Sequence, residues 1–420
     1  MLVTSGRLSR RAATIAFALL ALVSAASIAV AAEPIKVGFS MSMTGAVAPN
    51  GRQLLLALEI WRDDVNAAGG LLGRPVELVH YDDQSNPANV PGIYTKLLSV
   101  DKVDLLLGPY ATNMAAPAMP VIMDAKKTTL SMLAIGVNRH FNYDRYFSMV
   151  PVGPQGVAAF SRGFFELAAA QRPKPTTVAI IAADSEFART SADGARENAK
   201  ALGFSIAYER SYPPNTVEFA AIMRAVQAAN ADIVFVAAYP PDTVGIVRSA
   251  REIGLTAKMF GGTMTGLLAT PLKVQLGPAA NNILIMESFV PTFDFPGLKG
   301  FLAKYQERAK GQQVDPFGVG FGPFGYAAGQ ILAQAVTATK SLDHDQIAKY
   351  IHATRFQTVA GDVAFGKDGE WAAPRTVFTQ FQDVQPSNVE QFRDGAKQPV
   401  IWPDEYKTGK MIYPYAETKR

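Results

Sequence analysis

Short apolar segments alternate with helical segments along most of this chain, and that alternation is what most limits its fold. Ile35–Ser40, Val76–Tyr81 and Val103–Leu107 have the apolar character of buried strands, and the segments between them carry apolar residues at helical spacing. Strands that alternate with helices of this length form a parallel sheet with helices on both faces. The sequence therefore predicts an α/β fold.

The same pattern begins again after Pro151. Strands are expected at Thr177–Ala182 and Ile233–Ala237, and helices at Phe187–Leu202 and Thr243–Ile253. A chain of 420 residues is also too long for a single core. We predict two doubly wound parallel-sheet lobes joined by a hinge that the chain crosses three times. The predicted N-terminal lobe is 33–151 plus 289–374, and the predicted C-terminal lobe with the tail is 152–288 plus 375–420.

The first 32 residues have the composition of a secretory signal peptide. Arg7, Arg10 and Arg11 precede an apolar run over 12–30, and Ala29-Val30-Ala31 supplies the small residues of a cleavage site near 31–33. We therefore expect an exported protein. A membrane anchor is the alternative, because the run has about the right length for a span. The arginine pair leaves general and twin-arginine export both open.

Charge and cysteine content exclude several classes of function. Removing the signal peptide takes away three of the 40 Lys and Arg residues and none of the 36 Asp and Glu, so 37 basic and 36 acidic residues remain. Such a balance argues against a nucleic-acid partner, which demands a basic surface. The chain has no cysteine, which excludes thiolate nucleophiles and metal sites built on sulfur.

A candidate anion site follows the strand at 103–107. Gly108-Pro109 is expected to break that strand, and Thr112-Asn113 has the cap chemistry of a helix start. A helix that begins at the carboxyl end of a parallel strand offers unpaired N–H donors and the positive end of its dipole. We predict that a ligand carboxylate binds there. An ordinary helix cap is the alternative interpretation of Thr112.

Several segments occur in the order found in one known family. The mature chain resembles the periplasmic solute-binding proteins of ABC transporters, in the branched-chain amino acid (leucine/isoleucine/valine-binding) class with the type I periplasmic-binding-protein fold. The segments that carry the resemblance are Ile35-Lys36-Val37-Gly38, Thr44-Gly45, Val65 to Arg74 (VNAAGGLLGR), Tyr81 to Pro87 (YDDQSNP), Gly108-Pro109 and Val359 to Phe365 (VAGDVAF).

The resemblance implies a ligand site between the lobes. Thr112 occupies the position of the hydroxyl residue that holds the ligand carboxylate in amino-acid binders of this family, and Ile135 stands where their threonine helps to hold the amine. The acid that pairs with that amine should fall within Gly261–Thr265, where none is present. The candidate ligand-binding residues are Asn50, Tyr110, Thr112, Asn113, Leu133, Ala134, Ile135, Phe187, Tyr239 and Met264.

These departures predict a ligand without an ammonium group. Burying an ammonium without an anionic partner costs several kcal/mol, whereas apolar and aromatic walls favour a flat hydrophobic body. We expect an aromatic or hydrophobic carboxylate. The alternative is a branched-chain or other hydrophobic amino acid, if Asp184 or Glu186 supplies the missing charge. No cofactor is expected; the expected partners are an ABC permease and its ATPase.

Other functions find less support in the sequence. Gly320 to Gly325 (GFGPFG) matches a dinucleotide-binding fingerprint in spacing, but no clear strand precedes it, so we expect a loop before a helix at Tyr326. The four histidines are scattered, and Asp82-Asp83 is expected to be a strand-end turn rather than a catalytic pair. An enzyme is not expected. A ligand-sensing regulatory module of the same fold remains the alternative to a transport receptor.

Overall fold

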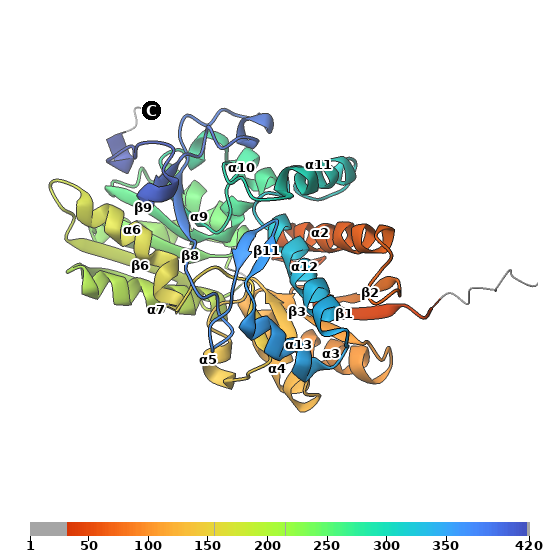
Figure 1. The fold of residues 1–420 in the computed structure, drawn as a ribbon. Coiled ribbons are helices and arrows are strands. Elements are labelled where there is room, and N and C mark those ends of the chain that lie inside the picture. The colour runs from red at the N-terminus through yellow and green to blue at the C-terminus, as the bar shows by residue number, and fades with distance from the viewer. Residues whose placement is uncertain (1–31, 155, 215, 418–420) are drawn as a thin grey trace, which may run out of the picture.

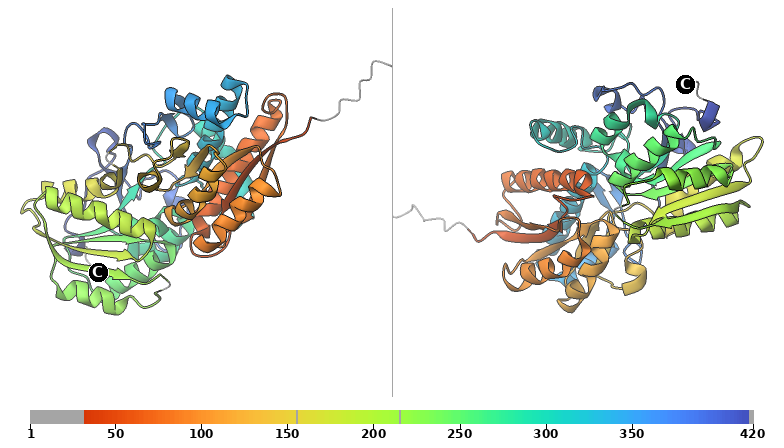
Figure 2. Two further views of the ribbon diagram at one scale, coloured as in Figure 1. Left: turned by 90° about the horizontal axis from the view of Figure 1, so that it is seen from below. Right: turned by 180° about the vertical axis from the view of Figure 1, so that it is seen from behind.

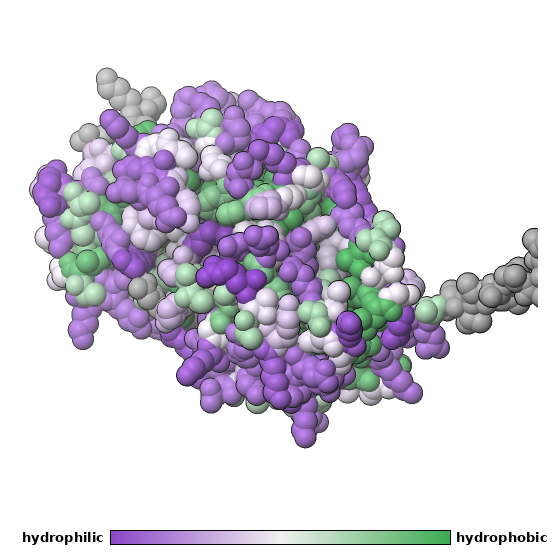
Figure 3. Space-filling view, viewed as in Figure 1, coloured by the Kyte–Doolittle hydropathy of each residue, from purple (hydrophilic) through white to green (hydrophobic). Residues whose placement is uncertain are grey.

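Two lobes lie side by side, each built on its own sheet (Figure 1, Figure 2). This computed structural model describes residues 32–154, 156–214 and 216–417, so the predicted signal peptide, apart from Ala32, lies outside the described residues. Within the described ranges, no helix has both the length and the apolar character needed to cross a bilayer. Hydrophilic side chains cover most of the face seen in Figure 3. The two-lobed α/β fold predicted from the sequence is confirmed.

The first lobe contains a sheet of five parallel strands in the order β2-β1-β3-β4-β5. Helices α2, α11 and α12 pack together beside this sheet, and α3 packs with α4. The strands are β1 (Ile35–Met41), β2 (Val76–Asp82), β3 (Leu105–Tyr110), β4 (Thr129–Met132) and β5 (Tyr146–Ser148). The helices are α2 (Ala48–Ala67), α3 (Val90–Ser99), α4 (Thr112–Asp124), α5 (Asn138–Phe141), α11 (Leu298–Ala309), α12 (Gly322–Thr339) and α13 (His344–Ala353).

The second lobe contains a sheet of seven strands in the order β14-β13-β10-β9-β8-β6-β7. Strands β6 to β10 are parallel, whereas β13 and β14 add to one edge in antiparallel orientation, which the sequence analysis did not anticipate. The strands are β6 (Thr177–Ala183), β7 (Ser205–Tyr212), β8 (Ile233–Ala238), β9 (Met259–Met264), β10 (Leu284–Glu287), β13 (Val377–Gln380) and β14 (Val400–Trp402). The helices are α6 (Ala159–Ala170), α7 (Glu186–Ala201), α8 (Ala220–Ala228), α9 (Pro240–Glu252) and α10 (Thr270–Leu276).

Short elements complete the described chain. A hairpin, β11 (Phe356–Thr358) with β12 (Gly361–Val363), forms a separate two-stranded sheet. The 3-10 helices are η1 (Pro87–Asn89), η2 (Gly156–Ala158), η3 (Thr265–Leu268), η4 (Gly277–Ala280), η5 (Glu390–Phe392), η6 (Asp404–Tyr406) and η7 (Tyr415–Glu417).

The chain passes between the lobes three times. It leaves the first sheet after β5, returns after β10 to build α11, α12 and α13, and crosses again before β13. The tail stays on the second lobe, where the Trp402 indole N–H donates to Glu166 Oε2 (2.9 Å). The residue boundaries given for the lobes above stay a prediction.

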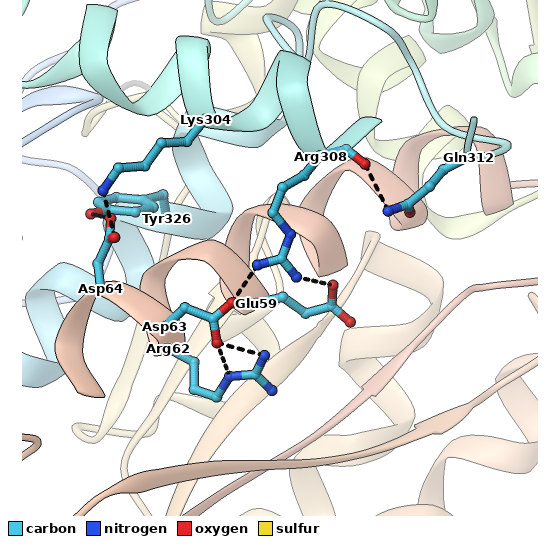
Figure 4. Close-up of polar contacts among 8 residues, drawn as sticks. All are labelled: Glu59, Arg62, Asp63, Asp64, Lys304, Arg308, Gln312 and Tyr326. Carbon is cyan, nitrogen blue, oxygen red and sulfur yellow. Dashed lines mark hydrogen bonds and ion pairs between the residues drawn. The ribbon is translucent and has the colours of Figure 1, made fainter. Parts of the chain in front are cut away.

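Ion pairs on the outside of the first lobe join α11 to α2 (Figure 4). Arg308 pairs with Asp63 and Lys304 with Asp64, and the Tyr326 hydroxyl of α12 donates to Asp64 Oδ2 (2.8 Å). Exposed pairs of this kind contribute little each to stability. They nevertheless show that the chain after the second crossing belongs to the first lobe, more than 230 residues from α2 in sequence.

Three local predictions are wrong. Gly108-Pro109 does not end β3, because the strand continues to Tyr110 while its register with β4 shifts between Leu107 and Tyr110. The glycine and proline residues of 44–51 also predict a loop over that whole segment, but the loop is shorter, since α2 begins at Ala48 and carries Asn50 in its first turn. Helix α12 begins at Gly322, inside the glycine-rich segment, because proline is well accommodated in the first turn of a helix.

Candidate functional site

A cavity lies between the lobes, at the carboxyl ends of the parallel strands of both sheets. The carboxyl edge of such strands is where ligands usually bind. We call it the central cavity. It is lined by Tyr110, Ala111, Thr112, Leu133, Ile135, Val150, Phe160, Phe187, Tyr239, Thr265, Leu268, Met286, Ser288 and Phe321.

The turn from β3 into α4 forms one wall. Ala111 precedes the helix with φ 74° and ψ 148°, a conformation that side-chain-bearing residues rarely adopt and that costs about 1–3 kcal/mol. Met114 and Ala115 donate to the Ala111 carbonyl (3.1 and 2.9 Å), whereas no described residue accepts from the N–H groups of Thr112 and Asn113. These two donors and the helix dipole make the wall electropositive without a basic side chain.

Thr112 does not act as a helix cap. It is the first residue of α4, it is 2 % exposed, and its Oγ1 accepts a hydrogen bond from the Ile135 backbone N–H (3.0 Å). The expected cap bond is therefore absent, because the side chain is committed to the loop after β4 instead. Since Oγ1 acts as acceptor there, the hydroxyl proton remains available to a ligand.

Aromatic rings from both lobes form most of the remaining wall. Phe187 lies against Tyr239 with ring centroids 5.4 Å apart and against Phe160 at 6.2 Å. From the first lobe, Tyr110 meets Phe321 edge-on at 5.6 Å and 81°. These spacings are within the range of favourable aromatic pairs, so the cavity offers ring faces and edges to a flat ligand.

The two tyrosine hydroxyls of the cavity are held by asparagines. Asn50 Nδ2 donates to the Tyr110 hydroxyl (3.0 Å), and the Tyr239 hydroxyl donates to Asn113 Oδ1. Burial raises the pKa of both tyrosines, so both stay neutral at physiological pH. The second bond joins the lobes, because Tyr239 follows β8 and Asn113 lies in α4.

The structure brings six of the ten predicted residues together around the central cavity: Tyr110, Thr112, Leu133, Ile135, Phe187 and Tyr239. The other four do not line it. Asn50 and Asn113 support the tyrosines, Ala134 is fully buried with its carbonyl accepting from Ser148 Oγ (2.8 Å), and Met264 is fully buried at the end of β9. Contact of any of the ten with the ligand stays a prediction.

Several lining residues were not identified from the sequence. Thr265 and Ser288 directly follow β9 and β10, so their position at strand ends was a usable signal. Phe160 lies on a helix, and Phe321 belongs to a segment that enters after α11, and neither carries a local sign of its position. Their role depends on how the crossings place the lobes.

Among the residues that the structure describes, none that lines the central cavity has a charged side chain. Asp184 and Glu186 lie on the other side of Tyr239 and pair with Arg189 (2.7 and 3.2 Å). They border a larger opening, which we call the outer cleft. The outer cleft is lined by Ala46, Val47, Ser85, Asn86, Pro87, Asn113, Met114, Ala116, Pro117, Ala183, Asp184, Ser185, Glu186, Arg189, Pro214, Thr216, Val217, Tyr239, Pro241 and Asp242.

Metal-ligating side chains and the Asp82-Asp83 pair are the other groups with potential chemistry. Within 32–417, leaving out 155 and 215, no group of three or more metal-ligating side chains was found. The Asp82-Asp83 pair is a strand-end turn as expected, since Asp82 accepts from Met43 and Thr44 N–H groups and Asp83 accepts from the Ser40 and Ser42 hydroxyls.

Comparison with known proteins identifies the family. The model of the periplasmic binding protein family matches residues 34–384. The Leu/Ile/Val-binding protein homolog 8 of Brucella abortus is 26% identical over 372 residues, which cover 84% of this chain and 91% of that protein.

Solved structures support the same fold. The branched-chain amino acid transporter substrate binding protein LivJ of Streptococcus pneumoniae, in complex with isoleucine, aligns with a TM-score of 0.73 at 21% identity, covering 88% of this chain and 100% of that one. A solute binding protein of an ABC transporter from Rhodopseudomonas palustris HaA2, in complex with p-hydroxybenzoic acid, also gives 0.73 at 21% identity, covering 92% and 100%. The chain therefore belongs to the periplasmic binding protein family, in the branched-chain amino acid class with the type I fold.

Proposed function

We propose that this protein is the solute-binding receptor of an ABC importer and that its ligand is an aromatic or hydrophobic carboxylic acid without an amino group. The observation that carries the proposal is a cavity with aromatic walls, a helix start at one end and no charged side chain. In this proposal the protein acts in the periplasm and delivers its ligand to a membrane permease driven by an ATPase.

The lack of an acid in the cavity disfavours an amino acid ligand. An ammonium group would lose its hydration on entering the central cavity and would find only aromatic faces and hydroxyl groups there. Such a loss costs several kcal/mol when no anion compensates it. The nearest acids named by the sequence, Asp184 and Glu186, border the outer cleft and are already paired with Arg189.

The start of α4, at one end of the central cavity, can hold a ligand carboxylate without a basic side chain. The N–H group and the hydroxyl of Thr112, together with the partial positive charge of about 0.5 at the start of α4, can hold an anion. The rings of Phe187, Tyr239 and Tyr110 would then cover the apolar body of the ligand. A ligand that touches both lobes favours the conformation in which they are closed.

Similar structures do not decide between the two ligand classes. The Streptococcus pneumoniae protein is in complex with isoleucine, whereas two Rhodopseudomonas palustris proteins are in complex with p-hydroxybenzoic acid and with benzoate. The fold therefore serves both, and the ligand must be inferred from the cavity itself. A hydrophobic amino acid is the second candidate, and a sensory module of the same fold is the alternative to a transport receptor.

Matched ligand pairs test the proposal directly. Calorimetry would compare 3-phenylpropanoate with phenylalanine and 4-methylpentanoate with leucine, because each pair differs only by the ammonium group. We expect the acid of each pair to bind at least about 100-fold more tightly, which corresponds to the several kcal/mol lost by an unpaired ammonium. Tighter binding of leucine or phenylalanine than of the corresponding acid would overturn the proposal.

A further inference from the structure

Two hydroxyl groups interrupt the apolar surface of the central cavity on the side of the second lobe. They belong to Thr265 and Ser288, which directly follow β9 and β10. Those strands are parallel neighbours, with Leu284 opposite Gly261 and Ile285 opposite Gly262. The two hydroxyl residues therefore lie on adjacent strand ends, beside the apolar side chains of Leu268 and Met286.

The hydrogen bonds that these two hydroxyl groups already make determine which hydrogen bonds a ligand can form with them. Thr265 Oγ1 donates its proton to the Ala238 carbonyl (3.2 Å), so toward the cavity it can only accept. The Ser288 hydroxyl makes no hydrogen bond to another described residue, and it can donate or accept. A ligand hydroxyl can satisfy both, since it donates one hydrogen bond to Thr265 and accepts one from Ser288.

The strand order places Ser288 further from the carboxylate wall than Thr265, which follows the intervening strand β9. Tyr239 follows β8 and contacts Asn113, the neighbour of Thr112, whereas Ser288 follows β10, two strands along the same edge. Neighbouring strands are about 4.8 Å apart, so the two positions are separated by about 10 Å. A flat acid that places its carboxylate near Thr112 and carries a hydroxyl at its far end would bring that hydroxyl towards Ser288.

We propose that Thr265 and Ser288 form a subsite for a hydroxyl group opposite the ligand carboxylate, so that the preferred ligands are hydroxy-substituted aromatic acids. This inference rests on the proposed function, because it assumes that the carboxylate binds near Thr112. Without a ligand hydroxyl, an unsubstituted ring would remove the Ser288 hydroxyl from water and leave it without a partner, which carries a cost.

Three ligands and two variants test the subsite. Calorimetry would measure benzoate, 4-hydroxybenzoate and 4-methoxybenzoate with the wild type, Ser288→Ala and Thr265→Val. We expect the wild type to prefer 4-hydroxybenzoate over benzoate by about 10-fold, as one or two buried hydrogen bonds predict. The methoxy compound cannot donate and should lose this advantage. Ser288→Ala should weaken 4-hydroxybenzoate about 10-fold. It should not weaken benzoate, because it removes the hydroxyl that benzoate would leave without a partner.

Ser185→Ala is the matched control, because Ser185 follows β6 at the same edge of the sheet but borders the outer cleft. It should leave the affinities for all three ligands unchanged. Equal affinity of the wild type for benzoate and 4-hydroxybenzoate would overturn the subsite and leave the proposed function standing. If no aromatic acid binds while leucine does, both the proposed function and the subsite are wrong.

Discussion

Two neighbouring cavities of this protein differ in whether charged side chains line them. None of the described residues that line the central cavity is charged, whereas a second cavity contains both Lys273 and Glu287, and Leu268 borders both cavities. We call the second one the Lys273 cavity. It is lined by Leu268, Thr270, Lys273, Glu287, Val290, Pro291, Phe317, Val319, Gly320, Phe392, Gly395 and Gln398.

The Lys273 cavity supplies its own partners. Lys273 is 9 % exposed and donates to Gln398 Oε1 (2.8 Å), and the Gln398 amide donates in turn to Glu287 Oε1 and to Thr379 Oγ1 (2.9 Å). Where the fold buries charge permanently, it builds a network to compensate it. The central cavity has N–H donors and rings but no charge, so any charge bound there must arrive with the ligand.

Removal of Lys273 should give the largest of the expected effects, a loss of stability. Lys273→Met leaves Glu287 buried without the cation, and we expect a loss of about 3 kcal/mol in the free energy of unfolding. Burial raises the pKa of Glu287, and Lys273 partly opposes this rise. Denaturant unfolding would measure the loss, with Lys299→Met on the exposed start of α11 as a control that should change stability little.

The pH dependence distinguishes lost charge compensation from lost packing. A carboxyl whose pKa is higher in the folded state contributes stability below its unfolded pKa and loses it as pH rises through the folded pKa. Without Lys273 the folded pKa of Glu287 rises further, so the variant should be more destabilised at pH 8 than at pH 5. Equal destabilisation at both pH values would mean that the lysine contributes only packing.

The same contrast shows how far sequence reasoning reaches. Strand β8 and helix α9, for example, follow from local patterns, and so does the helix start at Thr112, because periodicity and turn chemistry act over a few residues. The network of Lys273 joins residues 125 positions apart, and no local pattern in the sequence predicts it. Phe160 and Phe321 line the central cavity because the crossings set one lobe against the other, and neither carries a local sign of its position. The residues that the crossings bring to the site can therefore be identified only once the whole fold is known.

Truncation of an aromatic ring in the wall of the central cavity should weaken binding far more than truncation of an equally buried ring elsewhere. Phe187→Ala removes a ring from the central cavity, and we expect the affinity for an aromatic acid to fall about 30-fold, or about 2 kcal/mol. Phe204→Ala is the matched control, because both phenylalanines are 6 % exposed but Phe204 packs against Phe165 inside the second lobe. It should lower stability while the affinity stays within about 2-fold. Equal losses of affinity in the two variants would contradict the placement of Phe187 in the ligand wall.

The smallest expected effect concerns the hydrogen bond that separates the central cavity from the outer cleft. Tyr239→Phe keeps the ring but removes the hydroxyl that donates to Asn113 Oδ1, a bond between the lobes worth about 1 kcal/mol. Because this bond exists only while the lobes are together, we expect the ligand to dissociate about 5-fold faster in stopped-flow experiments.

Tyr110→Phe provides the contrast within one lobe. Its hydroxyl accepts from Asn50, and both residues belong to the first lobe, so this bond need not break when the lobes separate. We expect a loss of stability but little change in the dissociation rate. Adding Asn113→Ala to Tyr239→Phe should give no further acceleration, since both changes remove the same bond. Additive acceleration, or an equal effect of Tyr110→Phe, would show that the Tyr239 hydroxyl does not hold the lobes together.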